Sequence, residues 1–277
     1  MPRRVTIAHS PDADDAFMFY GLASGRVADP ELELVQVLAD IQTLNERALR
    51  GEYEVTAVSF HAYAHLTDRY LLLPHGASMG DAYGPVVVAR VPLTREALRA
   101  APVAVPGGLT TAALLLRFWD AALTQTPAPF DRILEDVLAG RAAAGLVIHE
   151  GQVTYASLGL VKIVDLGEWW TAATGLPLPL GGNVIRRDLG APLRRRLSAL
   201  LRDSIAFSLA HRAEALDYAM QYARGVDRVR LDRFVEMYVN DLTVAYGARG
   251  REAVARLFAF AYERGALPRF VTPEFVD

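Results

Sequence analysis

The first 165 residues of this chain alternate between short apolar runs and amphipathic helical patterns. Short apolar runs bounded by turn-forming residues are typical of buried strands. Strands that alternate with helices favour an α/β fold with a largely parallel sheet. We predict strands at residues 5–9, 32–37, 54–59, 70–74, 86–90, 103–105, 144–148 and 160–165.

The later part of the chain indicates two lobes rather than one. A break at Pro92 precedes a second set of strands, and the apolar stretch 175–183 carries two prolines, as expected of an extended segment that returns to the first lobe. Helical spacing of leucines then dominates, and we expect core-forming helices there without a site. The predicted domains are a large discontinuous α/β lobe, 1–91 plus 184–277, and a small inserted lobe, 92–183. This is the general plan of type II periplasmic-binding-protein-like folds, with an interlobe cleft.

Composition excludes several classes of function. The net charge of −3 offers no electrostatic footprint for nucleic acid. No apolar run is long enough for a membrane span, and the start lacks an apolar signal-peptide core, so we expect a cytoplasmic protein. Without cysteine there is no thiolate nucleophile. Lys162, the only lysine, lies inside an apolar run, so we expect no pyridoxal phosphate.

His149 is the best-placed candidate base. It follows the predicted strand 144–148 in the string G-L-V-I-H-E-G, and ligands of open α/β sheets sit beyond the carboxyl ends of strands. The alternative is a histidine that closes a strand end and hydrogen-bonds a neighbouring loop. We expect the adjacent Glu150 to point to the opposite face of an extended chain, which leaves it a supporting role at most.

Three acidic residues follow the first predicted strand, in the string S-P-D-A-D-D. Ser10 or Asp12 can cap a helix, and Asp14 and Asp15 in its first turn suit the positive end of the helix dipole. The functional alternative is that this loop lines a ligand cleft. A metal site is disfavoured, because adjacent helix positions cannot direct Asp14 and Asp15 to one point.

A histidine pair is the other pattern that could suggest a metal. His61 and His65 have the i, i+4 spacing of zinc ligands on a helix. The string lacks the intervening glutamate of H-E-x-x-H, and no third ligand is evident. We therefore favour a packed or surface histidine pair, and we expect no metal.

The string P-G-G-L-T-T-A, residues 106–112, is a candidate anion cradle. It follows the predicted strand 103–105 and opens a helix expected to reach about residue 126. Unpaired backbone N–H groups at a helix start and the hydroxyls of Thr110 and Thr111 are suitable donors. No Lys or Arg stands beside them, which favours a carboxylate over a phosphate. An ordinary capped helix is the alternative.

Several motifs together resemble those of the 1,4-dihydroxy-6-naphthoate synthase family, which acts in the futalosine route to menaquinone. The matching strings are A-H-S-P-D-A-D-D-A-F-M-F-Y, P-G-G-L-T-T-A, I-H-E and G-L-P-L-P-L-G, in the expected order over nearly the whole chain. The resemblance implies a carbon–carbon lyase. Its substrate would be cyclic dehypoxanthinyl futalosine, and its products 1,4-dihydroxy-6-naphthoate and dihydroxyacetone. It implies no cofactor.

The resemblance also implies roles for individual residues. His149 would be the proton acceptor, and Thr110 and Thr111 would bind a small-molecule carboxylate substrate. The full set of expected substrate-binding residues is Ser10, Asp14, Ala57, Val58, Ser59, Thr110, Thr111 and Asn183. An imidazole with a pKa near its unperturbed value of about 6.5 suits the proton transfer.

Three other functions stay open at this stage. Chorismate dehydratase of the same pathway shares the fold, but that family does not carry I-H-E at the His149 strand end. A solute-binding protein for a small carboxylate would not need a histidine where arginine binds better. A ligand-sensing regulator would bring a basic DNA-binding helix, which is not evident. The oligomeric state is open, with a homodimer as one alternative.

Overall fold

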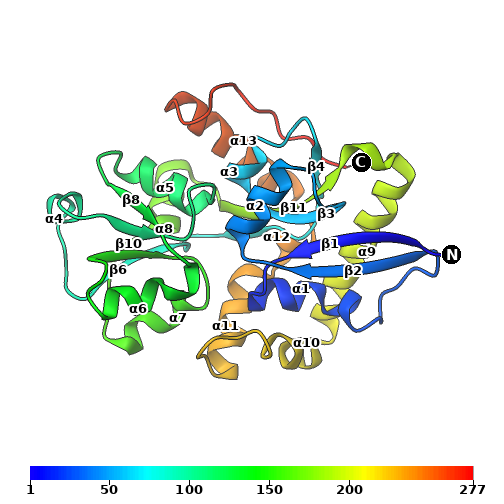
Figure 1. Ribbon diagram of the computed structural model, residues 1–277, viewed down its shortest axis with the longest axis horizontal. Coiled ribbons are helices and arrows are strands. Elements are labelled where there is room, and N and C mark those ends of the chain that lie inside the picture. The colour runs from blue at the N-terminus through cyan, green and yellow to red at the C-terminus, as the bar shows by residue number, and fades with distance from the viewer. Residues whose placement is uncertain (277) are drawn as a thin grey trace.

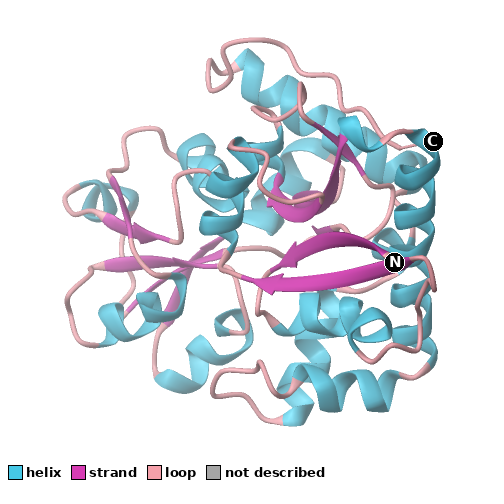
Figure 2. Ribbon diagram, turned by 45° about the vertical axis from the view of Figure 1, so that its right-hand side comes forward, coloured by secondary structure: helices cyan, strands magenta, loops and turns pink. Residues whose placement is uncertain are grey.

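The computed structural model describes residues 1–276 and contains two β-sheets, each flanked by helices (Figure 1, Figure 2). The larger sheet has the strand order β2-β1-β3-β11-β4, and β5 pairs with β11. Its strands are β1 (Arg3–His9), β2 (Leu32–Leu38), β3 (Val55–Ser59), β4 (Tyr70–Leu72), β5 (Ser78–Gly80) and β11 (Leu178–Arg186). The mixed α/β, two-lobed fold expected from the sequence is confirmed.

Strand pairing brings three separate segments together at one edge of this sheet. β1 runs parallel to β3, so the carboxyl ends of both strands, at His9 and Ser59, lie at the same edge. β11 runs antiparallel to β3, with Gly181 opposite Ser59 and Asn183 opposite Ala57. The loop after β1 and the middle of β11 are therefore both close to the end of β3.

The smaller sheet repeats this arrangement. Its strand order is β10-β6-β9-β7-β8, and β7 runs parallel to β9. The strands are β6 (Val86–Ala89), β7 (Val103–Val105), β8 (Gln125–Pro127), β9 (Ala144–Val147) and β10 (Val161–Asp165). The loops that follow β7 and β9 therefore start at the same edge, and they carry the double-glycine segment and His149.

Helices flank both sheets in Figure 1. Those around the larger sheet are α1 (Ala13–Ala23), α2 (Ile41–Leu49), α3 (Phe60–Tyr63), α9 (Ala191–Ala210), α10 (Arg212–Ala219), α11 (Arg228–Tyr238), α12 (Asp241–Val244) and α13 (Gly247–Glu263). Those around the smaller sheet are α4 (Arg95–Arg99), α5 (Thr111–Trp119), α6 (Ile133–Leu138), α7 (Gly151–Thr154) and α8 (Leu166–Thr174). Single 3-10 turns occur at Phe130–Arg132, Tyr155–Leu158 and Arg187–Leu189.

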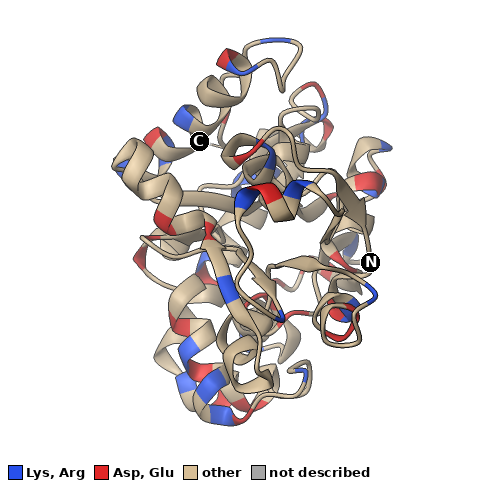
Figure 3. Cartoon of the chain, turned by 90° about the vertical axis from the view of Figure 1, so that its left-hand side faces the viewer, with Lys and Arg blue, Asp and Glu red and all other residues tan. Residues whose placement is uncertain are grey.

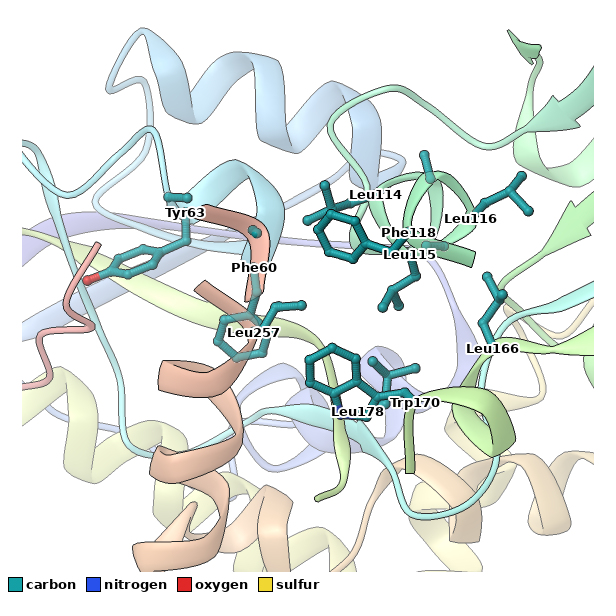
Figure 4. Packing of buried hydrophobic residues seen from close by; sticks show 14 of the residues in the cluster. Phe60, Tyr63, Leu114, Leu115, Leu116, Phe118, Leu166, Trp170, Leu178 and Leu257 are labelled. Carbon is teal, nitrogen blue, oxygen red and sulfur yellow. The ribbon is translucent and has the colours of Figure 1, made fainter. Parts of the chain in front are cut away.

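One apolar core joins the two lobes (Figure 4). Phe60 of α3 and Leu257 of α13 belong to the same buried cluster as Leu115 of α5 and Trp170 of α8. All four side chains are fully buried, and burying a large apolar side chain contributes about 1.5–3 kcal/mol. The lobes are therefore held together by packed side chains as well as by the chain itself.

The chain crosses between the sheets twice, at residues 81–85 and 166–177. Leu166 N–H donates to the Pro85 carbonyl at 2.9 Å, and a Cβ on Gly167 would lie 2.0 Å from backbone atoms of Tyr83. The expected lobe boundaries lay at 91/92 and 183/184. β6 in fact pairs within the smaller sheet, and β11 begins in the larger sheet at Leu178, because an apolar run such as V-V-V-A can enter either sheet.

Local predictions succeed where a cap defines the element. The sequence predicts a helix over residues 41–49 with Asp40 as its cap, and Asp40 Oδ1 accepts from Thr43 N–H at 3.0 Å at the start of α2. The helix expected to reach about residue 126 is wrong in length, because α5 ends at Trp119. Asp120 leaves the helical conformation and pairs with Arg99 at 2.8 Å, and β8 follows.

Two further findings concern the exterior. In residues 1–276 no helix has the length and apolar character needed to cross a membrane. Figure 3 shows acidic and basic residues interspersed on the face it presents.

Candidate active site

A cavity of about 710 Å³, including space open to solvent, lies between the two sheets. Of residues 1–276, no Lys or Arg lines it. The lining residues are Ser10, Asp12, Asp14, Asp15, Ile41, Ala57, Val58, Ser59, Gly76, Ser78, Pro85, Thr110, Thr111, Ala112, Ile148, Leu180, Gly181, Gly182, Asn183 and Tyr238. All eight expected substrate-binding residues are among them, whereas His149 is not.

One wall of the cavity is formed by the start of α5. Thr110 Oγ1 caps the helix, accepting from Ala113 N–H at 3.2 Å and donating to the Gly107 carbonyl at 2.7 Å. Thr111 Oγ1 donates to the Leu180 carbonyl at 2.6 Å and accepts from His61 N–H at 3.1 Å. Both hydroxyl protons are therefore committed within the protein. What this wall offers an anion is chiefly the backbone N–H groups of the first helical turn and the positive end of its dipole.

Neutral polar groups of the larger sheet continue this wall. Ser59 N–H donates to Asn45 Oδ1 at 2.9 Å, and Asn45 Nδ2 donates to Ser59 Oγ at 3.1 Å. Asn183 Nδ2 donates to the Gly76 carbonyl at 2.9 Å, while its buried Oδ1 has no partner in residues 1–276. The sequence reasoning missed Asn45, because a polar residue on an amphipathic helix gives no signal of its partner.

The opposite wall is acidic and is formed by the start of α1. Ser10 N–H donates to Asp15 Oδ2 at 2.8 Å, and Ser10 Oγ donates to Asp12 Oδ2 at 2.6 Å. Ser78 Oγ of β5 donates to Asp14 Oδ2 at 3.3 Å. Asp14 and Asp15 both line the cavity. The N-terminal end of α1 faces the cavity, so the adjacent side chains of Asp14 and Asp15 both reach it.

Burial makes these carboxyl groups hard to ionise. Burial raises the pKa of Asp14 well above its usual value, and the nearby charges of Asp15, Asp12 and Glu150 raise it further. Burial likewise raises the pKa of Asp15 to about 7, although the hydrogen bond from Ser10 N–H opposes the shift. Burial therefore favours the protonated form of the carboxyl groups in this wall.

His149 lies beside the cavity, with both ring nitrogens bonded to backbone. Nδ1 accepts from Gly151 N–H at 2.9 Å, so Nε2 carries the proton and donates to the Phe130 carbonyl at 3.0 Å. The neighbouring Ile148 lines the cavity instead. Burial lowers the pKa of His149, which keeps the ring neutral and able to accept a proton.

Glu150 corrects the expectation of an extended chain. Its φ of −51° and ψ of −17° are helical, so its side chain does not point away from His149. Glu150 Oε2 lies 3.8 Å from His149 Nδ1, and Oε1 accepts from Ala13 N–H of α1 at 3.2 Å. Burial is the main cause that raises the pKa of Glu150 to about 7. Glu150 thus links the two lobes at the start of α1.

The C-terminal helices also contribute, contrary to the expectation that they hold no site. Tyr238 of α11 lines the cavity and donates its hydroxyl to Gln152 Oε1 of α7 at 2.7 Å. Arg224, in the segment between α10 and α11, pairs with Asp12 at 3.0 Å and lies 4.8 Å from the centre of the Phe130 ring. In the sequence, Tyr238 and Arg224 have the pattern of ordinary core and surface positions. Only the packed structure shows that they belong to the site.

The expected histidine pair is packed together. The rings of His61 and His65 are 5.7 Å apart. Burial is the main cause that lowers the pKa of His61 to about 4. Both residues lie outside the set that lines the cavity.

Comparison with known proteins connects this cavity to a family. The family described as "Menaquinone biosynthesis" matches residues 5–263. The 1,4-dihydroxy-6-naphthoate synthase of Thermus thermophilus is 45% identical over 270 residues, covering 98% of each chain. The enzyme of the same name from Streptomyces coelicolor is 39% identical over 272 residues, covering 95% of this chain and 94% of its own.

Solved structures agree with the fold. A crystal structure of a protein from Archaeoglobus fulgidus is 48% identical with a TM-score of 0.91, covering 95% of this chain and 98% of that one. The alkanesulfonate-binding protein SsuA of Xanthomonas axonopodis, bound to MOPS, has a TM-score of 0.73 at 14% identity, covering 98% and 96%. The second likeness concerns the periplasmic-binding-protein-like fold alone.

Proposed function

The chain belongs to the menaquinone biosynthesis family, and we propose that it is a 1,4-dihydroxy-6-naphthoate synthase. The reaction is the lyase cleavage of cyclic dehypoxanthinyl futalosine to 1,4-dihydroxy-6-naphthoate and dihydroxyacetone. The observation that carries this proposal is the cavity itself, which is lined by the motifs of four segments distant in the sequence. Neutral donors form one wall, protonatable carboxyl groups form the other, and a neutral histidine lies beside them.

The substrate carboxylate is best accommodated at the start of α5. Backbone N–H groups of a first helical turn bind anions without a basic side chain, and Ser59 and Asn183 add polar atoms on the larger sheet. The acidic wall repels an anion unless its carboxyl groups are protonated. The aromatic carboxylate should therefore face Thr110 and Thr111, and the polyhydroxylated part of the substrate should face Asp14.

We assign the proton acceptor role to His149. A neutral imidazole can take a hydroxyl proton, and the resulting electron pair can expel the three-carbon fragment as the ring becomes aromatic. Nδ1 must first leave Gly151 N–H, since that hydrogen bond occupies its lone pair. We infer that substrate binding moves the His149 ring away from Gly151 N–H, which frees the Nδ1 lone pair. The adjacent Glu150 Oε2, 3.8 Å away, would then stabilise the imidazolium.

A product assay tests the proposal directly. The purified protein is incubated with cyclic dehypoxanthinyl futalosine, and the fluorescence of the naphthoate and the formation of dihydroxyacetone are followed together. We expect both products in equal amounts without an added metal or cofactor. The absence of naphthoate over a broad range of pH and temperature would refute the proposal.

Two further expectations stay predictions from the sequence. One is a cytoplasmic location, and the other is a homodimer as one alternative for the oligomeric state. Size-exclusion chromatography coupled to light scattering measures the second.

A further inference from the structure

The acidic wall holds one carboxyl group to which the function proposed above assigns no proton transfer. Asp14 is 9% exposed, lines the cavity, and lies on the lobe opposite to Thr110 and Thr111. Its Oδ2 accepts from Ser78 Oγ at 3.3 Å. No Lys or Arg lines the cavity in residues 1–276, so no cation is placed there to hold Asp14 as an anion.

We propose that the Asp14 carboxyl group is the acid that protonates the departing three-carbon fragment, a role that rests on the proposed lyase function. The spiro ring first opens, which converts its ether oxygen into the ring hydroxyl group and leaves the fragment with a carbonyl group next to the carbon that departs. The carbon–carbon bond between ring and fragment then breaks, and this carbonyl group takes up the electron pair, so the fragment becomes an enediolate. The ring carbon becomes a carbonyl carbon and tautomerises into the aromatic product. Asp14 gives its proton to the enediolate carbon, which completes dihydroxyacetone.

The protons and electrons balance without another reactant. His149 gains the proton of the ring hydroxyl group, and Asp14 loses one to the fragment. Solvent then returns a proton to Asp14 and removes one from His149. The step consumes no oxidant, reductant or water.

The other acids near the cavity are already committed to protein contacts. Asp12 pairs with Arg224 at 3.0 Å, and Asp15 accepts the Ser10 N–H at 2.8 Å. Glu150 accepts the Ala13 N–H at 3.2 Å and is absent from the cavity wall. These backbone donors favour the ionised form of a carboxyl group. Asp14 accepts a hydrogen bond from the hydroxyl group of Ser78. A backbone hydrogen bond from Asp15 lowers the pKa of Asp14, but burial and the nearby carboxyl groups raise it by more.

The groups that face Asp14 favour its protonated form. Asp12 and Asp15 on the same segment, and Glu150 from the smaller lobe, all raise the pKa of Asp14, adding to the larger effect of burial. Tyr238 from α11 also lies close, and its hydroxyl group is neutral because burial raises its pKa well above the usual value. A bound carboxylate substrate would add a further negative charge. A protonated acid near the leaving fragment typically contributes about 10²–10⁴-fold to a rate.

The variant Asp14→Asn tests this role, because it keeps the shape of the side chain and removes the acidic proton. We expect kcat to fall at least about 100-fold and KM to change less than about threefold. In the wild type, kcat should fall as the pH rises through the raised pKa of Asp14, and Asp14→Asn should lack this alkaline limb. Asp14→Glu, which restores an acid, should recover part of kcat.

Controls separate the outcomes. Asp203→Asn makes the same change on the exposed face of α9 and should leave both kcat and KM unchanged.

Three results for Asp14→Asn would overturn the proposal while the lyase function stands. They are a kcat within about threefold of the wild type, a rise in KM alone, and a smaller loss of kcat than in Asp15→Asn. Naphthoate production by the wild type is measured in the same assay, and its absence overturns both. If Asp14→Asn melts at a lower temperature than the wild type, the kcat and the pH profile of Asp14→Glu decide instead. A pH profile equal to that of the wild type opposes the proposed role of Asp14 as the acid. A shifted alkaline limb supports that role.

Discussion

The two walls of the cavity use opposite means to present polar groups. At the start of α5, Thr110 and Thr111 direct their hydroxyl protons into the protein, which leaves backbone N–H groups for a ligand. At the start of α1, Asp14 and Asp15 direct carboxyl groups into the cavity itself. Both walls are helix starts, and both therefore carry a positive dipole end. The first suits an anion, whereas the second is occupied by the protein's own acids, so we assign binding to the first and proton transfer to the second.

The largest expected effect falls on the proton-transfer side. His149→Asn should lower kcat at least about 100-fold with little change in KM, because asparagine can replace the two backbone hydrogen bonds but cannot take up a proton. Steady-state kinetics on the naphthoate signal measure both constants. His65→Asn, outside the cavity, is the control. Near-normal turnover would remove His149 from the mechanism.

The binding wall should respond in KM instead. Thr110→Val removes the hydroxyl group that caps α5 and orders the cradle, so we expect KM to rise about tenfold. The lost cap should also cost about 1 kcal/mol of stability. Thr110→Ser keeps the hydroxyl group and should behave as the wild type in both respects. An unchanged KM in Thr110→Val would show that this wall does not bind the carboxylate.

Glu150 joins the two walls, and its effect should appear in stability. Its pKa rises from 4.5 in the unfolded chain to about 7 in the folded one, so folding loses stability as the pH rises through this window. Glu150→Gln keeps the acceptor for Ala13 N–H and removes the ionisation. Its melting temperature should match the wild type at pH 4 and exceed it by about 2–4 °C or more at pH 8. An equal difference at both pH values, read by calorimetry, would contradict the assignment.

The smallest effect on KM and stability should come from Arg224, which pairs with Asp12 of the acidic wall. Arg224 pairs with Asp12 while 35% of its side chain stays exposed, and such pairs contribute about 0.2–1 kcal/mol. Arg224→Ala should therefore change KM less than about threefold and barely alter the melting temperature. Arg249→Ala, which breaks another exposed pair with Asp81, is the matched control. A large loss of kcat only in Arg224→Ala would mean that the acidic wall depends on this cation.

The sequence by itself determined most of the elements and the residues that meet in the cavity. Periodicity predicts the strands that end at His9, Ser59 and Val105, and Asp40 marks the start of α2. These features depend on neighbours along the chain, so they can be read locally. The motifs also place Ser10, Ser59 and Thr110 at strand or helix ends.

Only the tertiary structure decided how the side chains are used. It turned the end of α1 into the cavity, tied both nitrogens of His149 to backbone, and brought Tyr238 from a helix expected to form only core. Each outcome depends on contacts between residues far apart in the sequence, and local spacing carries no information about them. Burial follows from the same packing, and it sets which acids stay protonated. The chemistry of Asp14 is therefore a property of the assembled cavity.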